Sequence, residues 1–157
     1  MSKIDKITNA ISSFFLSKKQ KEIKKRTSRQ TIGYIGEDIA CKYLSEHGYA
    51  ITDRNARISH KELDIVAEDD NYTVIVEVKT LSLTRDQAER ESRRASEQID
   101  REKARNLLSA AKAYTSRNYN GKMTRIDVIE VYLGAKDPEI VHIENAVTKS
   151  TVHRHRR

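Results

Sequence analysis

From residue 31 onward, the pattern of apolar and polar positions predicts helices and strands in turn. Apolar side chains recur at helical spacing over residues 33–47, and Gly48 follows where a left-handed cap is expected. Residues 84–116 contain no Gly or Pro and also predict helix, with the clearest apolar face between Ile99 and Tyr114. Five segments have the residue types of strands: residues 49–56, 62–68, 73–80, 125–133 and 139–143. This order of elements predicts an α/β domain.

Residues 62–68 and 73–80 predict a β-hairpin, because the polar residues between them are typical of a tight turn. A two-residue loop and a four-residue loop give the same register, which pairs Ile65 with Val76. In that register one face is wholly apolar and is expected to be buried: Leu63, Ile65, Ala67, Val74, Val76 and Val78. The other face carries the charges, with Asp64 opposite Glu77 and Glu62 opposite Lys79.

Two carboxylates that face each other across a strand pair lie about 5 Å apart at their Cβ atoms and repel. A divalent cation between Asp64 and Glu77 would remove this repulsion, and Mg²⁺ prefers carboxylate and carbonyl oxygens. The Val78 carbonyl could complete such a site, and Lys79 could reach a phosphate or activate a water. The alternative is a solvated polar face on which Glu62 and Lys79 form a weak surface pair.

One acid of the helix predicted over residues 33–47 has a distinctive position. On a helical wheel Glu37 lies beside Leu44, at the border of the apolar face, whereas Asp38 points away from it. Glu37 is therefore a candidate third carboxylate of the site. The alternative is that Glu37 serves only the helix, because an acid in the first turn interacts favourably with the helix dipole.

Composition excludes several classes of protein. The chain has 157 residues, of which 37% are hydrophobic and 34% charged, with one Pro and one Cys, Cys41. A single Cys excludes an internal disulfide, a CxxC redox motif and a cysteine-based zinc site, and it is typical of a reducing compartment. No apolar run reaches the roughly 18 residues of a membrane span, so stable membrane insertion is not expected. We therefore expect a cytoplasmic protein.

The net charge of +7 is unevenly distributed along the chain. Residues 1–30 hold nine Lys or Arg and two acids, which accounts for the whole excess. Residues 149–157 are also basic, and the segment between these termini has more acids than bases. The predicted organisation is a basic arm (residues 1–30), an α/β domain (residues 31–148) and a basic tail (residues 149–157). An acidic domain that handles nucleic acid would need metal ions to offset its repulsion of phosphates.

The arm has an amphipathic pattern, with Ile4, Ile7 and Ile11 at helical spacing, followed by a cluster of Lys and Arg between Lys18 and Arg29. Three interpretations stay open. The arm could be a mobile or docked appendage, a segment with affinity for nucleic acid, or a helix that lies on a membrane surface.

Several spaced motifs resemble those of a known family. They are Gly33-x-x-Gly36-Glu37-Asp38-x-Ala40; Tyr43-Leu44-x-x-x-Gly48-Tyr49-x-Ile51-x-x-Arg54-Asn55-x-Arg57; Glu62-Leu63-Asp64-Ile65-Val66-Ala67; and Val76-Glu77-Val78-Lys79. Over residues 33–146 the chain resembles the YraN family of functionally uncharacterised bacterial proteins. That family is in turn similar to restriction-endonuclease-like nucleases and, among these, to archaeal Holliday-junction resolvases.

The resemblance implies a restriction-endonuclease-like fold, with a mixed central sheet flanked by helices. It implies a metal-dependent endonuclease that acts on DNA, including branched or junction DNA. In this interpretation Asp64, Glu77 and the Val78 carbonyl bind one or two Mg²⁺ or Mn²⁺ ions, and Lys79 orients the attacking water. Glu37 falls on a helix-borne acid of the resolvase-like branch, and it would complete the metal site or position the water.

Basic residues near these motifs are candidate contacts to DNA phosphates. Lys103 and Arg105 lie where the family has a basic helix after the active-site strand. Arg54 and Arg57 follow the first predicted strand, together with Asn55. A solvated helix face explains Lys103 and Arg105 equally well, and the residues after the strand could instead cap the backbone.

DNA is thus the expected partner, and a homodimer is left open. Two other functions also stay open: a nucleic-acid-binding module whose acidic site no longer cuts, and an interaction protein that its amphipathic arm recruits to a membrane or a complex. Metal-dependent cleavage would separate the endonuclease from both alternatives. Binding without cleavage would separate the two alternatives from each other.

Overall fold

The computed structural model describes residues 28–91 and 99–153. The chain divides into two compact units, Met1–Ile32 and Gly33–Arg157, and the sheet lies in the second. The elements in chain order are α2 (Ser28–Glu46), β1 (Ala50–Ile58), β2 (Lys61–Glu68), β3 (Tyr72–Leu81), α3 (Arg85–Arg90), α4 (Arg101–Arg117), β4 (Met123–Tyr132), β5 (Glu139–Ile143) and α5 (Lys149–His153). The amphipathic pattern and most of the basic cluster predicted for the arm lie outside the described residues. None of the described helices is long and apolar enough to cross a membrane.

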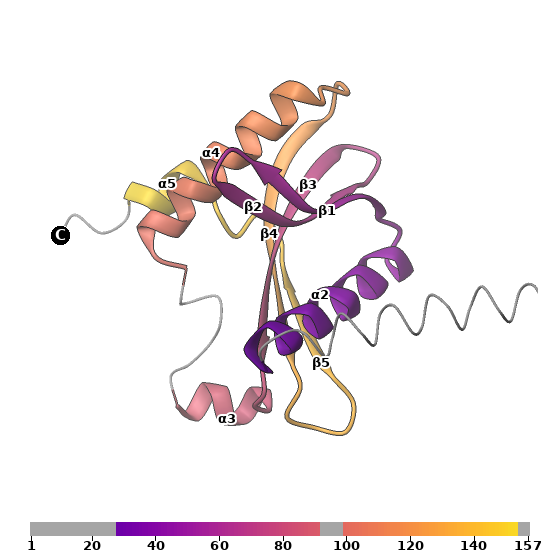
Figure 1. The fold of residues 1–157 in the computed structure, drawn as a ribbon, viewed down its shortest axis with the longest axis vertical. Coiled ribbons are helices and arrows are strands. Elements are labelled where there is room, and N and C mark those ends of the chain that lie inside the picture. The colour runs from indigo at the N-terminus through magenta and orange to yellow at the C-terminus, as the bar shows by residue number, and fades with distance from the viewer. Residues whose placement is uncertain (1–27, 92–98, 154–157) are drawn as a thin grey trace, which may run out of the picture. The chain divides into compact units, whose positions relative to one another are not determined.

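The five strands form one mixed sheet in the order β1-β2-β3-β4-β5, and Figure 1 shows the elements in colours that run from indigo at α2 to yellow at α5. β3 and β4 are parallel, and the other neighbouring pairs are antiparallel. Parallel neighbours need a long crossover connection, and the segment that carries α3 and α4 supplies it. The predicted α/β class, a mixed sheet with flanking helices, is confirmed.

The predicted hairpin of β2 and β3 is confirmed, and so is its register, because Ile65 pairs with Val76. The Asp69 N–H donates to the Tyr72 carbonyl across 3.1 Å, which closes a two-residue turn. The Asp69 carboxylate also accepts hydrogen bonds from the N–H groups of Asn71 and Tyr72. A side chain that satisfies the turn's own backbone in this way stabilises the turn and fixes the register.

The ladder between β2 and β3 ends at the pair Ile65–Val76. Beyond it β2 is paired with β1 alone, and β3 is paired with β4. The prediction that Glu62 lies opposite Lys79 is therefore wrong, because neither residue belongs to the β2–β3 ladder. Glu62 pairs with Arg57 of β1, and Lys79 pairs with Glu130 of β4. The β1–β2 ladder, in contrast, continues to the pair Ile58–Lys61 beside the short turn that joins these two strands.

Two apolar clusters cover the two faces of the sheet. One includes residues of α4: Leu63, Val66, Ile75, Ile126 and Val128 with Ala104, Leu107, Ala110 and Ala111. The other includes residues of α2: Ile65, Val74, Val76, Ile129 and Val131 with Ala40 and Leu44. The prediction that Leu63 and Ile65 share a face is wrong. Leu63 packs in the cluster with α4, whereas Ile65 packs in the cluster with α2, and the β2–β3 ladder ends between them.

The prediction of a helix over the whole of residues 84–116 is wrong, because this segment contains two separate helices, α3 and α4. Asp100 explains why a new helix, α4, begins at Arg101. Its side chain accepts a 2.8 Å hydrogen bond from the N–H of Lys103 and so caps the N-terminus of α4. The predicted apolar face of this second helix is confirmed at Leu107 and Ala111, which are buried.

Gly36 marks a close approach between α2 and β3. A Cβ atom at this position would collide with the side chain of Thr80. Because Glu37 follows Gly36 directly, this close approach brings the candidate acid Glu37 near β3. At the other end of the helix, Gly48 adopts the predicted left-handed conformation, with φ 85°.

Candidate active site

Glu77 is a buried carboxylate on β3, with 3% of its surface exposed. Its Oε1 atom lies 2.9 Å from Nζ of Lys79 on the same strand and 3.0 Å from Nζ of Lys103 on α4. Its Oε2 atom has no hydrogen-bond partner among the described residues. Two cations therefore share one oxygen, while the other is buried alone, which is costly unless a further group binds it.

Asp64 lies at the same end of the β2–β3 pair. Its Oδ2 atom accepts a 2.8 Å hydrogen bond from the N–H of Val78. Burial, followed by the charge of Glu77, raises the pKa of Asp64 to about 7, although the Val78 hydrogen bond and the charge of Lys103 lower it. The structure thus brings Asp64 and Glu77 together, but by a side-chain contact to β3 and not as a ladder pair.

Glu37 is joined to β1 by Asn55, whose Nδ2 donates to Glu37 Oε2 across 3.2 Å. The guanidinium of Arg54 lies 2.9 Å from Asp38 Oδ1 and 3.9 Å from Glu37 Oε2. Arg54, one of the predicted phosphate contacts, is therefore engaged with α2. Glu37 is close enough to Asp64 for its charge to help raise the pKa of that residue.

Asn55 has an unusual backbone for a residue inside a strand, with φ 52°. In the β1–β2 ladder it lies between two pairs that set it opposite Asp64. Asn tolerates the left-handed region better than most residues, yet such strain costs on the order of 1 kcal/mol and is concentrated at functional sites. The sequence by itself predicts for Asn55 only a backbone cap or a phosphate contact. Its contact with Glu37 could not be read from the spacing.

A pocket of about 410 Å³ lies beside Glu77 and is lined by several of the residues that surround it. Glu37, Asn55, Asp64 and Lys103 line it. The remaining lining residues come from the β1–β2 turn, from the start of β2 and from α4: His60, Lys61, Glu62, Asn106, Leu107 and Ala110. The pocket therefore lies between a helix and a hairpin, with acidic and basic side chains in its wall.

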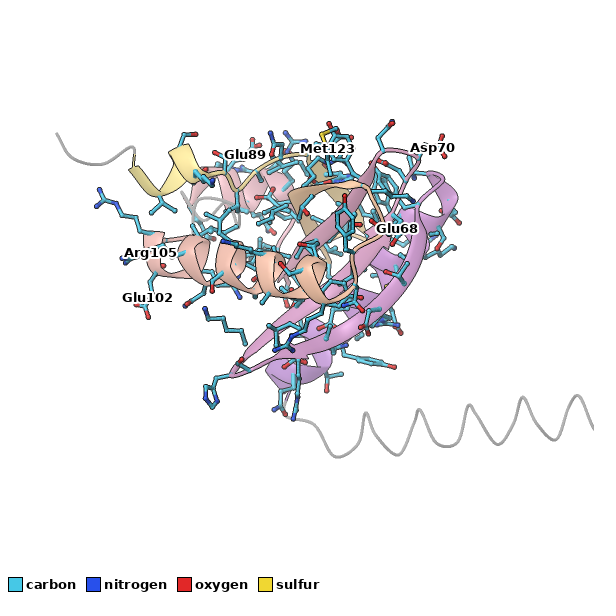
Figure 2. The ribbon with its side chains drawn as sticks, turned by 90° about the horizontal axis from the view of Figure 1, so that it is seen from above. Glu68, Asp70, Glu89, Glu102, Arg105 and Met123 are labelled. Carbon is cyan, nitrogen blue, oxygen red and sulfur yellow. The ribbon has the colours of Figure 1, made fainter. Side chains whose placement is uncertain are left out.

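The four predicted DNA contacts occupy different places. Lys103 is in the site itself and Arg54 is beside it. Arg57 is exposed on β1. Arg105 is exposed on α4, where its Nε bonds the carbonyl of Arg101, and Figure 2 shows it on the outer side of the helix. Of these four residues, only Lys103 both contacts Glu77 and lines the pocket.

The donor set of the site suits a hard cation that keeps much of its water. Within residues 28–91 and 99–153, no group of three or more His, Cys, Asp or Glu side chains is arranged to hold a metal. Asp64 and Glu77 offer two carboxylates, and Mg²⁺ is commonly bound by only one or two, with waters in the other positions. The lone Oε2 of Glu77 supports this fit.

A second buried acid, Asp127 on β4, belongs to a different cluster, which the sequence did not reveal. It accepts hydrogen bonds from the Arg125 guanidinium, from His142 Nε2 at 2.9 Å and from the Asn145 N–H at 2.8 Å. Burial by itself would raise the pKa of Asp127, but the contacts with His142 and Arg125 outweigh it and lower the pKa. With both its oxygens bonded, Asp127 has the environment of a structural residue.

Known relatives match most of the chain. The sequence model of the uncharacterised protein family UPF0102 matches residues 36–131. A UPF0102 protein of Caldanaerobacter subterraneus is 34% identical over 126 residues, which cover 78% of this chain and 98% of that protein. UPF0102 proteins of Persephonella marina and Bacteroides thetaiotaomicron are 38% and 40% identical, over 73% of this chain and 90% of each relative. The chain therefore belongs to the UPF0102 family, which is the YraN family that its motifs resemble.

Proposed function

We propose that this protein is a metal-dependent endonuclease that hydrolyses phosphodiester bonds in DNA. The observation that carries the proposal is the environment of Glu77, a buried carboxylate with lysines on one oxygen and no described partner on the other. A second acid, Asp64, lies beside it. Paired acids with an adjacent ammonium group are suited to phosphodiester hydrolysis, because the acids bind a metal and the cations stabilise charge on the phosphate.

Asp64, Glu77 and the carbonyl of Val78 would hold the cation. The N–H of Val78 points toward β2, because it donates to Asp64, and in an extended strand the carbonyl of a residue points to the same side as its N–H. The ladder has ended by this point, so the main chain of β2 does not pair with that carbonyl. A bound Mg²⁺ or Mn²⁺ would supply charge neutralisation at the phosphate and a water of lowered pKa.

Lys79 and Glu37 would act on the attacking water. The ammonium group of Lys79 is held 2.9 Å from Glu77, where it can orient a water and stabilise negative charge on the phosphate. Glu37, positioned by Asn55, would accept a hydrogen bond from the same water. Similarity of the family to archaeal Holliday-junction resolvases makes four-way junctions the first substrates to test.

A nucleic-acid-binding module that does not cut is the second candidate. The observation in its favour is that Lys79 and Lys103 already neutralise Glu77, so the buried carboxylate has counter-ions without a metal. The third candidate, recruitment to a membrane or a complex, depends on the N-terminal arm and on residues outside those described.

The test is to incubate the purified full-length protein with Mg²⁺ or Mn²⁺ and a panel of linear and branched DNAs. Glu77→Ala and Asp64→Ala should abolish cleavage, because they remove the metal ligands. Both should keep DNA affinity in EDTA to within about threefold, since phosphate contacts come from cations. Lys112→Gln is the matched control, because it removes an exposed charge of α4 that is neither a predicted DNA contact nor a partner of Glu77.

The outcomes separate the candidates. Metal-dependent cleavage that Glu77→Ala loses and Lys112→Gln keeps supports the endonuclease. Equal cleavage by wild type and Glu77→Ala would mean that a contaminant cuts the DNA. Binding without cleavage under all metal conditions would favour the binding module.

A further inference from the structure

Lys103 lies at the boundary between the buried centre of the site and its open pocket. Its Nζ atom is 3.0 Å from Oε1 of Glu77, and 40% of the Lys103 side chain is exposed, against 3% for Glu77. It also lines the pocket that contains Glu37 and Asp64. The ammonium group can therefore reach either the buried carboxylate or a ligand in the pocket.

Lys103 shares its contact with Glu77 with a second positively charged side chain. Lys79 lies 2.9 Å from the same oxygen, and the two ammonium groups repel each other there. Lys79 is on the same strand as Glu77, whereas Lys103 comes from another element and is the more exposed of the two. Lys103 is thus the cation that leaves more readily when a further positive charge arrives.

We propose that Lys103 is an internal counter-ion of the site, which a divalent cation displaces from Glu77 and which then contacts a DNA phosphate. The inference rests on the proposed function, because it needs a metal at Asp64 and Glu77. Metal and DNA then bind cooperatively, since the metal releases the cation that holds the phosphate. In the absence of DNA, Lys103 competes with the metal for Glu77.

Removal of this competitor should strengthen metal binding. We expect Lys103→Gln to bind Mn²⁺ roughly tenfold more tightly than the wild type by titration calorimetry, because one positive charge no longer occupies the carboxylate. Arg105→Gln removes the same charge from the same helix without touching Glu77 and should bind Mn²⁺ as the wild type does. Equal or weaker binding of Mn²⁺ by Lys103→Gln would overturn the proposal.

The variant should fold, because the start of α4 depends on the main chain of Lys103 and not on its side chain. Asp100 accepts its hydrogen bond from the Lys103 N–H. Lys103→Met, which keeps the aliphatic part of the side chain, is a second variant with the same expected gain in Mn²⁺ affinity. Circular dichroism in EDTA confirms the fold of each variant before titration.

DNA binding gives a second readout that does not depend on cleavage. With Ca²⁺ present, Lys103→Gln should reduce the slope of log affinity against log salt by about 0.9 for a duplex, which is one lost phosphate contact. In EDTA the slope should be unchanged, because Lys103 is then held by Glu77. Arg105→Gln should change the slope equally in both conditions or not at all. A slope reduced equally with and without Ca²⁺ would show that Lys103 is an ordinary surface contact and would overturn the proposal.

The two proposals fail in distinguishable ways. If wild type binds Mn²⁺ and cuts DNA while Lys103→Gln binds Mn²⁺ no more tightly, only the counter-ion role of Lys103 is lost. If neither protein binds Mn²⁺, the metal-dependent function and this inference are both overturned. If only Lys103→Gln binds Mn²⁺, no cation displaces Lys103 in the wild type, and the metal-dependent function and this inference are again both overturned.

Discussion

The Asp64 carboxylate accepts a 2.8 Å hydrogen bond from the N–H of Val78, at a point where the ladder between β2 and β3 has already ended. A side chain thus takes the place of the main-chain partner that Val78 would have in a longer hairpin. The bond keeps the N–H satisfied and holds an acid close to Glu77. The position of Asp64 therefore depends on the separation of the two strands.

The raised pKa of Asp64 predicts a pH-dependent gain in stability for Asp64→Asn in EDTA. The folded value, about 7, lies above the ordinary value of 3.8, so the folded protein binds this proton more tightly than the unfolded chain. The contribution of Asp64 to the wild-type free energy of unfolding is thus greatest below pH 4 and falls as the pH rises to about 7. Asn can still accept the Val78 bond. At pH 8 we expect Asp64→Asn to be more stable by about 1 kcal/mol in urea unfolding.

Asp70→Asn, at an exposed position in the β2–β3 turn, is the control and should show no such pH-dependent gain. Saturating Mn²⁺ should reduce or reverse the advantage of Asp64→Asn, because the metal stabilises the wild-type folded state. An Asp64→Asn variant that is less stable at every pH would contradict the expected charge repulsion.

Two substitutions of Asn55 distinguish the effect of its left-handed backbone from the effect of its hydrogen bond to Glu37. Asn55→Gly accepts φ 52° freely, whereas Asn55→Ala does not, so the Ala variant should be less stable than the Gly variant by about 1 kcal/mol. Both variants lose the contact with Glu37, and any cleavage should fall by the same factor in both. Unfolding and cleavage are measured on the same preparations. Equal stabilities would show that the left-handed backbone carries no strain.

Two glycines of α2 should respond in opposite ways to substitution by Ala. Gly36→Ala should cost about 1–3 kcal/mol in the free energy of unfolding, because the new methyl group collides with Thr80. Gly33→Ala has open space and should be neutral or more stable by up to about 1 kcal/mol, because Ala favours helix. The Gly36→Ala loss should shrink in a Thr80→Ala background, as measured in a double-mutant cycle. A loss independent of residue 80 would place its cause elsewhere.

Asp127 should matter for stability and not for metal binding. Asp127→Asn removes the buried negative charge that pairs with Arg125 and His142 and should cost about 3 kcal/mol in urea unfolding. Because the pKa of Asp127 is lowered, its contribution is present above the ordinary Asp pKa and is lost as the pH falls through the folded value. The loss in Asp127→Asn should therefore be smaller in acid. A changed Mn²⁺ affinity in this variant would contradict its separation from the site.

Much of the fold followed from local patterns. The period-two alternation and the polar turn were enough to set the register that pairs Ile65 with Val76, because a one-residue slip would turn the buried face outward. The helix end at Gly48 and the strand over residues 139–143 were likewise local features. The helical wheel singles out Glu37, and the hairpin register singles out Asp64 and Glu77. The motif resemblance adds their expected roles.

The tertiary structure decided where the β2–β3 ladder ends and which distant side chains meet. The sequence cannot tell where the β2–β3 ladder ends, because that depends on contacts with elements distant in sequence. The ladder ends before Glu62 and Leu63, and Leu63 packs with α4. It also cannot tell that Lys103 reaches Glu77. That contact depends on how α4 is oriented by the burial of Leu107 and Ala111 against the sheet. Alternation along a strand is a short-range property, whereas contacts between side chains distant in sequence depend on the packing of whole elements.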